Sequence, residues 1–418
     1  MRNNIKRLFS LASLLRSPCG EVSPLAEERS GLEINMQSNR VRKAKKITTF
    51  LTGLILILAI ASSAFASQYP GAVFLMIWPG ARPTGLAGAF SAIADDASAL
   101  YYNVGGLGFL NSTYATVMHA PWLPGLYPGM AYDFLGFCHS IRNQGTIGAN
   151  IIYINTGETQ VVNQEGIELG EYTTFDFSIS GSYGFKINPK LGAGVTAKFI
   201  YSFLVPDWVW QAMPELQITT GGVGVSWALD GGVLYKPRNN ISIGTSISNI
   251  GPNISYTSSG ESDPLPRMLR LGVKYTPLQN ENVKLNITPE ITKVMVGLFF
   301  DETRDKTFWQ KFNYELWEAW KSVGIEAWFF DLASLRLGYF EDISGQRGGI
   351  LVNRGGSDEH IALTDYLFSK DRGKFAGKVG LCFGIGIQFK GFQFDVGNDQ
   401  MIYDFDTKNY KFSLTYHF

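Results

Sequence analysis

The fold is decided by a stretch near the carboxyl end in which every second residue is apolar, Val379-Gly380-Leu381-Cys382-Phe383-Gly384-Ile385-Gly386-Ile387-Gln388-Phe389. The residues between the apolar ones are small or polar. Because the side chains of a strand alternate between the two faces of a sheet, this period of two predicts a strand with one apolar face. A soluble β-sandwich and a barrel embedded in lipid both satisfy such a pattern.

The same alternation recurs along most of the chain and predicts an all-β protein of about fourteen strands. The expected strands are 112–119, 131–140, 145–155, 174–182, 195–203, 223–230, 240–249, 269–275, 281–293, 322–330, 335–342, 379–389, 391–398 and 409–418.

The connections between these strands favour the barrel in lipid. Every second connection is tight, as at 142–144 and 390–391, whereas the connections between them are long, with 343–375 the longest. Short turns at one rim and long loops at the other are typical of outer-membrane barrels, and a soluble sandwich does not impose this strict alternation. We therefore expect a transmembrane antiparallel β-barrel over residues 112–418, surrounded by outer-membrane lipid.

The last expected strand ends on an aromatic residue. One of its faces is apolar throughout, which resembles the signal that the barrel-assembly machinery reads in outer-membrane proteins, although an ordinary edge strand could share this feature. The residues of this face are Tyr410, Phe412, Leu414, Tyr416 and Phe418.

Composition excludes several classes of function. Lys plus Arg and Asp plus Glu are each 36, so the formal charge is zero, and a nucleic-acid partner, which needs a basic surface, is not expected. The three Cys and four His are scattered, which predicts no metal site, no cofactor and no disulfide scaffold, while leaving open a disulfide between Cys138 and Cys382. No Ser and Asp pattern accompanies the histidines, so we do not expect an enzyme. The acidic residues of 343–375 suit a solvated loop better than a calcium site.

The N-terminal region carries an export signal. A basic cluster between Arg40 and Lys46 precedes an apolar run from Phe50, and Ala64-Phe65-Ala66 forms a small-residue cleavage pattern. We interpret 36–66 as a signal peptide rather than a membrane anchor, because its apolar core is short. Residues 1–35 then form an upstream extension or a mis-assigned start, since Met36 lies just before the basic cluster.

The polar faces of the strands would line the barrel lumen. A barrel of about fourteen strands is too wide for side chains alone to fill, so something should plug it. The charged residues expected in the lumen are Asp176, Lys198, Asp230, Arg270, Lys274, Glu326, Arg336, Asp395 and Lys411.

Residues 67–111 are the expected plug. Leu86, Phe90 and Ile93 recur at helical spacing, which predicts a helix within 85–94, and Asp95 or Asp96 can cap a second short helix. We expect this compact hatch to sit in the lumen, with the two aspartates held by lumen cations such as Arg270 or Arg336.

This segment resembles the PorV/PorQ family of the wider FadL-like group of outer-membrane barrels. The family pattern of G-A-R, small and apolar residues, A-D-D-A-S-A, an aromatic pair and N-P-A-G-L is matched, except that Val104-Gly105 replace Pro-Ala. The matching positions include Gly80, Arg82, Gly85, Gly88, Asp95, Asp96, Ser98, Asn103 and Gly106. Further agreement occurs at 227–232, 263–267 and 336–339.

The resemblance implies a fourteen-stranded barrel with an N-terminal hatch in the outer membrane of a Gram-negative-type bacterium. The PorV branch implies a type IX secretion component that binds exported proteins through their C-terminal signal domains, or a secretion translocon. The FadL branch implies transport of fatty acids or other hydrophobic small molecules, and a structural barrel without transport is a third alternative. The aromatic and apolar residues expected to contact a partner or ligand from the long loops are Trp122, Tyr127, Trp208, Trp210 and Met213.

Overall fold

The computed structural model describes residues 69–125, 128–163, 165–212, 220–257, 261–299, 305–399 and 409–418. The proposed extension 1–35 and signal peptide 36–66 lie outside the described residues.

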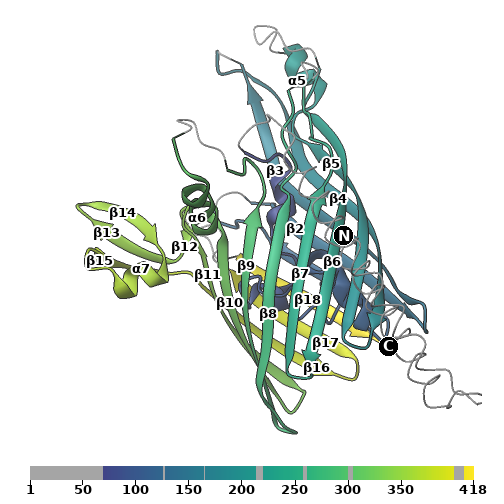
Figure 1. Ribbon diagram of the computed structural model, residues 1–418. Coiled ribbons are helices and arrows are strands. Elements are labelled where there is room, and N and C mark those ends of the chain that lie inside the picture. The colour runs from purple at the N-terminus through teal and green to yellow at the C-terminus, as the bar shows by residue number, and fades with distance from the viewer. Residues whose placement is uncertain are drawn as a thin grey trace, which may run out of the picture. The chain divides into compact units, whose positions relative to one another are not determined.

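Within these residues, fourteen antiparallel strands close into a barrel, which confirms the predicted fold class (Figure 1). Each strand pairs with its neighbours in the sequence around the ring, and β18 closes the ring on β1, where Tyr114 lies opposite His417. The barrel strands are β1 (Tyr114–Pro121), β2 (Ala131–Ile141), β3 (Gly145–Val162), β4 (Glu168–Asn188), β5 (Leu191–Phe203), β6 (Val223–Arg238), β7 (Ile241–Ile250), β8 (Met268–Gln279), β9 (Val283–Val294), β10 (Trp320–Phe329), β11 (Ala333–Asp342), β16 (Leu381–Phe389), β17 (Phe392–Asp399) and β18 (Asn409–His417).

The two faces of each strand have opposite environments. On β16, Phe383, Ile385 and Ile387 are exposed on the outer face, while Gly384 and Gly386, which alternate with them, are buried on the inner face. An outer face of large apolar side chains is stable only where acyl chains replace water around it. The period of two therefore has the physical meaning that the sequence predicted.

The two rims of the barrel differ as expected. One rim carries only tight turns, at 142–144, 189–190, 239–240, 280–282, 330–332 and 390–391. The other carries α5 (Asp207–Ala212), α6 (Phe308–Glu318) and a small second sheet formed by part of 343–380. The predicted loop 343–375 is thus largely folded, and its core contains Ile350, Val352 and Ile361.

The long connection expected between the strands 145–155 and 174–182 is wrong, because β3 and β4 continue through most of it and pair, for example Glu158 with Thr173. Both faces of this hairpin extension carry polar residues. Beyond the lipid neither face has to be apolar, so the backbone ladder continues without the alternation that reveals a strand in the sequence.

The N-terminal segment consists of short helices joined by turns. They are η1 (Val73–Met76), α3 (Ala81–Thr84), α4 (Ala99–Tyr102) and η2 (Val104–Phe109). The predicted helix within 85–94 does not form, because Gly88 adopts a φ of 76° and the ring of Trp78 occupies the space that a Cβ would need there. Leu86, Phe90 and Ile93 are all buried, so their spacing indicated burial rather than a helix.

Among the helices in the described part of the chain, none has the length and apolar character that a membrane span requires. Cys138 and Cys382 are both buried and form no disulfide with each other.

Replacing a lipid-facing residue in the middle of β16 by arginine should destabilise the barrel. We expect Ile385→Arg to lower the free energy of unfolding in lipid vesicles by about 2–4 kcal/mol, because a charge near the bilayer midplane is costly. Phe389→Arg, on the same face beside the short turn, should cost about 0–1 kcal/mol. The two wild-type side chains are 56% and 62% exposed, so equal losses in urea titrations would contradict the assigned depth.

Candidate functional site: hatch and extracellular surface

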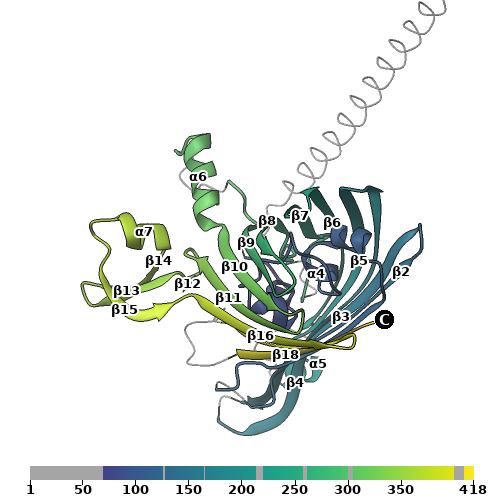
Figure 2. The same cartoon turned by 90° about the horizontal axis from the view of Figure 1, so that it is seen from below.

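Arg82 of α3 joins the hatch to the barrel wall. Its Nε donates a hydrogen bond to Glu326 Oε1 of β10 at 2.8 Å, and its Nη1 donates to Asp95 Oδ1 at 2.7 Å and to Asp96 Oδ2 at 2.8 Å. Arg82 and Glu326 are both buried inside the barrel. In Figure 2, which looks at the barrel from below, α4 of the same segment lies inside the ring of strands.

A second arginine extends this ion cluster to neighbouring strands along the inner face of the barrel. Arg336 of β11 donates from Nε to Glu326 Oε1 at 2.9 Å and from Nη1 to Asp395 Oδ1 of β17 at 2.8 Å. Asn286 of β9 also donates to Glu326, at 3.1 Å. The buried carboxylate of Glu326 is therefore saturated with donors, which is the condition under which a buried charge is tolerated.

The predicted partners of Asp95 and Asp96 are wrong, since both aspartates pair with Arg82 of the hatch itself. Arg270 lies instead over the ring of Tyr101, with its Cζ 4.9 Å from the centroid, and donates to Ser248 Oγ. Alternation along a strand shows which charges face the lumen. It does not show the height of a charge or its angle around the barrel, so it could not predict whether Arg270, Arg336 or the hatch residue Arg82 pairs with the two aspartates.

Other polar bonds tie the hatch to further strands. Ser91 donates from its backbone N and its Oγ to Glu290 of β9, at 2.8 and 2.6 Å. Lys411 of β18 donates to the carbonyl oxygen of Trp78 at 2.7 Å and pairs with Asp399. The prediction missed Glu290, although its inward position between outward apolar residues of β9 was a usable signal.

The remaining predicted lumen charges lie on the inner face but not in this cluster. Lys198 pairs with Asp230 at 3.1 Å and donates to Asn249. Asp176 and Lys274 are half-buried.

The small residues of the hatch motif permit close backbone approach. A Cβ on Gly85 would lie 2.8 Å from the Cα of Gly384 on β16. Replacing either glycine by a larger residue would therefore push the hatch away from the barrel wall. Asn103 fixes the opposite side, because its Nδ2 donates to the carbonyl oxygens of Ser91 and of Val233 on β6. Of the other motif residues, Ser98 donates its N–H to Asp96, and Gly80, Gly88 and Gly106 each lie against hatch atoms that a Cβ would meet.

The aromatic loop residues that were predicted to contact a partner are only partly exposed to solvent. Trp122 is buried against Tyr132, so it offers no exposed contact. Trp208 and Trp210 are half-buried, and Trp208 packs edge-on against Tyr172. Tyr127 and Met213 lie outside the described residues.

A cluster of exposed aromatic residues lies on α6, which the prediction did not single out. The polar side of this helix faces the barrel, where Glu315 and Glu318 pair with Lys293 of β9 at 2.5 and 2.8 Å. Its other side carries Phe308, Trp309, Phe312 and Leu316, all exposed. Surface helices normally bury their apolar stripe, so α6 is oriented the opposite way. The dense aromatic content of 308–317 was the available sequence signal.

The terminal strand presents the predicted apolar face to the outside. Tyr410, Phe412, Leu414 and Phe418 are exposed, whereas Tyr416 is half-buried and packs between Phe392 and Phe418. The backbone N–H of Phe418 donates to the carbonyl oxygen of Thr113 and the N–H of Thr113 donates to that of Phe418, which completes the closure of the ring.

Among the described residues, no group of three or more His, Cys, Asp or Glu side chains is placed to hold a metal ion.

Neutralising Glu326 should loosen the hatch and destabilise the whole barrel. We expect Glu326→Gln to lower the free energy of unfolding by about 3–5 kcal/mol, because it leaves two buried guanidinium groups without their shared carboxylate. The backbone amides of the hatch should then exchange with deuterium faster in the folded protein. The matched variant Glu318→Gln, at the partly exposed pair with Lys293, should cost about 0–1 kcal/mol. Similar stability and similar amide exchange of the two variants would refute the anchoring role.

Comparison with known proteins gives structures of the same architecture at low similarity. The Pseudomonas putida toluene transporter TodX matches with a TM-score of 0.43 and 11% identity, over 77% of this chain and 94% of that chain. A Pseudomonas aeruginosa FadL homologue matches with a TM-score of 0.42 and 12% identity, over 81% of this chain and 98% of that chain. Similarity at this level carries no argument about what this chain binds. No curated protein matches the chain.

The sequence profile described as "Type IX secretion system protein PorV" matches residues 67–299. This range contains the hatch with Arg82, Asp95 and Asp96, and the strands from β1 to β9. The match spans more than half of the chain and confirms the resemblance that the hatch motif indicated. The chain belongs to the PorV family and is an outer-membrane barrel of the PorV type.

Proposed function

We propose that this protein is a type IX secretion component that binds exported proteins through their C-terminal signal domains, in the outer membrane of a Gram-negative-type bacterium. The observation that carries this proposal is the outward apolar face of α6. Four large apolar side chains on one side of a helix above the barrel rim form a surface that is costly to leave in water.

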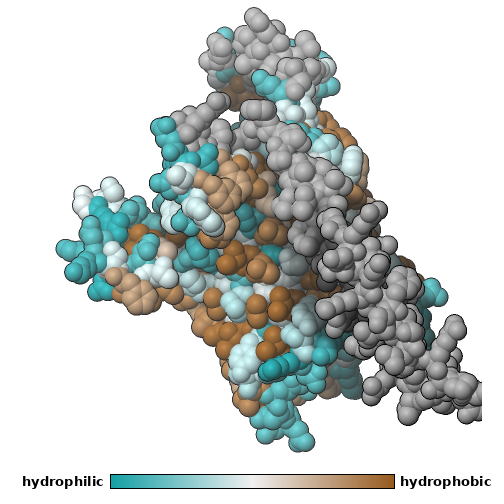
Figure 3. Space-filling view, in the orientation of Figure 1, coloured by the Kyte–Doolittle hydropathy of each residue, from teal (hydrophilic) through white to brown (hydrophobic). Residues whose placement is uncertain are grey.

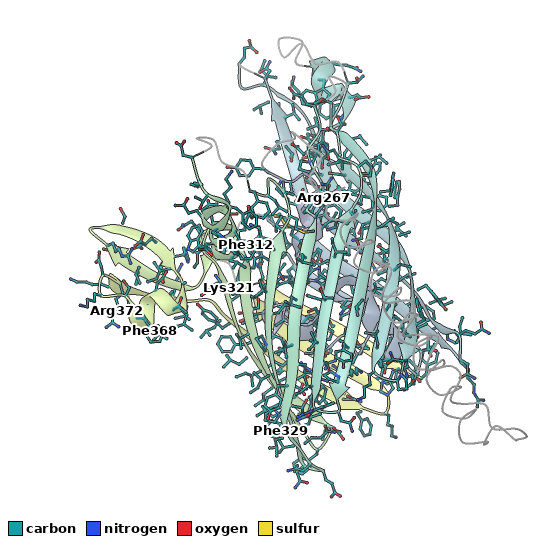
Figure 4. The ribbon with its side chains drawn as sticks, viewed as in Figure 1. Arg267, Phe312, Lys321, Phe329, Phe368 and Arg372 are labelled. Atoms are coloured by element: carbon teal, nitrogen blue, oxygen red, sulfur yellow. The ribbon has the colours of Figure 1, made fainter. Side chains whose placement is uncertain are left out.

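The position of α6 suits a protein partner rather than lipid. Figure 4 places Phe312 above Lys321, which lies at the loop end of β10, so α6 extends past the strand ends. The ion pairs of Glu315 and Glu318 with Lys293 hold the helix in this orientation. A rigid aromatic surface with charged residues at its border has the composition of a binding hot spot.

The hatch supports a binding role over conduction through the lumen. Arg82, Ser91, Asn103 and Lys411 bond the N-terminal segment to strands on several sides of the barrel. Transport of a hydrophobic small molecule would require this segment to shift or the wall to open, and the described strands pair around the whole ring. Unchanged uptake of long-chain fatty acids in a deletion strain would argue against the transport alternative.

Removing the aromatic side chains of α6 should weaken cargo binding. We expect the double variant Phe308→Ser and Trp309→Ser to capture at least tenfold less of an exported protein's purified C-terminal signal domain, because one aromatic hot-spot residue already contributes about 2 kcal/mol or more and tenfold corresponds to about 1.4 kcal/mol. Binding is measured on the detergent-solubilised full chain by surface immobilisation.

Phe330→Ser is the matched control, because Phe330 is an equally exposed aromatic residue on a turn of the opposite rim. Phe330 is 68% exposed and Trp309 is 69% exposed. If the α6 variant captures as much signal domain as the wild type, α6 is not the binding surface. Loss of capture in both variants would point to a general loss of folding.

A further inference from the structure

A small sheet projects sideways from the barrel next to β11 (Figures 1 and 2). We call it the lateral sheet, and it comprises β13 (Ile350–Arg354), β14 (Ser357–Ile361), β15 (Lys374–Val379) and the helix α7 (Leu363–Phe368). Its strand order is β14-β13-β15, and Tyr366 of α7 packs on its core with Val379. Nothing in the binding role of α6 accounts for this sheet.

Backbone hydrogen bonds fix the lateral sheet to the barrel wall. Phe340 of β11 donates to the carbonyl oxygen of Gly380 at 2.8 Å and accepts from Gly349 at 2.9 Å, and Gly380 in turn donates to Gly349. The N–H of Leu363, the first residue of α7, donates to the buried carboxylate of Glu341 at 3.0 Å. The orientation of α7 relative to the barrel is therefore set by the same strand that crosses the membrane.

One border of the lateral sheet is strongly apolar. Phe368 at the end of α7 is 83% exposed, more than any other large apolar side chain among the described residues, and Leu367 and Phe375 are also exposed. Figure 4 shows Phe368 below Lys321 and above Phe329, the two labelled residues near the ends of β10. In Figure 3 the apolar lower border of the sheet lies level with the apolar belt of the barrel. In this view Phe368 thus lies between the heights of the two ends of β10, whereas Phe312 lies above both of them.

Positive charges lie directly beside this apolar border. The segment 369–378 contains a single acidic residue, Asp371, and four exposed cationic side chains. The cationic side chains are those of Lys370, Arg372, Lys374 and Lys378. The guanidinium of Arg372 lies over the ring of Tyr366, with its Cζ 5.3 Å from the centroid. Among the described residues no ion pair is found for the three lysines. Exposed apolar groups next to unpaired cations are the combination that binds anionic membrane surfaces.

We propose that the lateral sheet is a membrane foot. Its apolar border of Leu367, Phe368 and Phe375 enters the outer leaflet beside β11. Lys370, Arg372 and Lys374 bind the phosphates of a phosphorylated glycolipid of the lipid A class. The proposal rests on the outer-membrane location but not on cargo binding by α6. A protein occupant is disfavoured because acyl chains already surround the barrel at the depth of Phe368.

Depth-dependent quenching tests the insertion of Phe368. A fluorophore is attached to Phe368→Cys in a Cys19→Ser background of the full chain, reconstituted in nanodiscs that contain acyl chains carrying nitroxide groups. Cys138 and Cys382 are buried in the folded barrel. Leu337→Cys on the outer face of β11 is the control in lipid, and Phe312→Cys on α6 is the control above it.

We expect quenching at Phe368 to match that at Leu337 and to exceed that at Phe312 several-fold. Quenching at Phe368 as weak as that at Phe312 would overturn the insertion. Undiminished signal-domain capture by the α6 variant, which would sink the cargo proposal, changes none of these readings, so failure of the cargo proposal and failure of the membrane foot are distinguishable.

Lipid retention tests the headgroup contact. We expect the triple variant Lys370→Gln, Arg372→Gln and Lys374→Gln to retain roughly a hundredfold less lipid A per barrel after detergent extraction, since each of the three cations near an anionic surface adds about fivefold. The control variant Arg142→Gln, Lys190→Gln and Lys390→Gln removes the same charge from the opposite rim and should retain lipid A normally. Unchanged retention in the first triple variant, or equal wild-type retention of phosphatidylglycerol, would overturn the assignment to lipid A.

Discussion

The architecture depends on the fact that lipid offers no hydrogen-bond partner to a peptide group. A strand in acyl chains is stable only if both of its edges are paired, so the fourteen strands must form a ring without a free edge. The closure of β18 on β1 at Tyr114 and His417 satisfies this condition at the end of the chain. The other elements of the described residues are attached to this ring.

The width of the ring creates the second constraint. Fourteen strands enclose a lumen that their own side chains cannot fill, and the N-terminal segment occupies it. This filling combines an apolar cluster, in which Phe90 of the hatch and Tyr132 and Phe134 of β2 are buried, with polar and charged residues of the inner faces. Charges buried in this way are tolerated only when they are saturated, and Glu326 achieves this through Arg82, Arg336 and Asn286.

The two rims differ in the structure that they carry, because one has only tight turns and the other has long connections. Tight turns leave no room for additional structure, whereas the long connections carry α6 and the lateral sheet. Both present apolar groups outward but at different depths relative to β10. In our proposals α6 meets a protein above the membrane, and the lateral sheet meets lipid within it. A foot fixed beside β11 would also limit the rotation and tilt of the barrel under α6.

The sequence by itself determined the ring, since lipid imposes a period of two that is local and visible in any strand, as on β16. It also marked the hatch, because the motif around Arg82 lies within one short segment. Only the tertiary structure decided that Arg82 and not Arg270 holds Asp95 and Asp96, that Trp122 is buried, and that α6 turns its apolar side outward. These outcomes depend on how the turns of the hatch bring Arg82 onto the two aspartates and on how strands and loops pack against each other, and alternation along a single strand contains neither quantity.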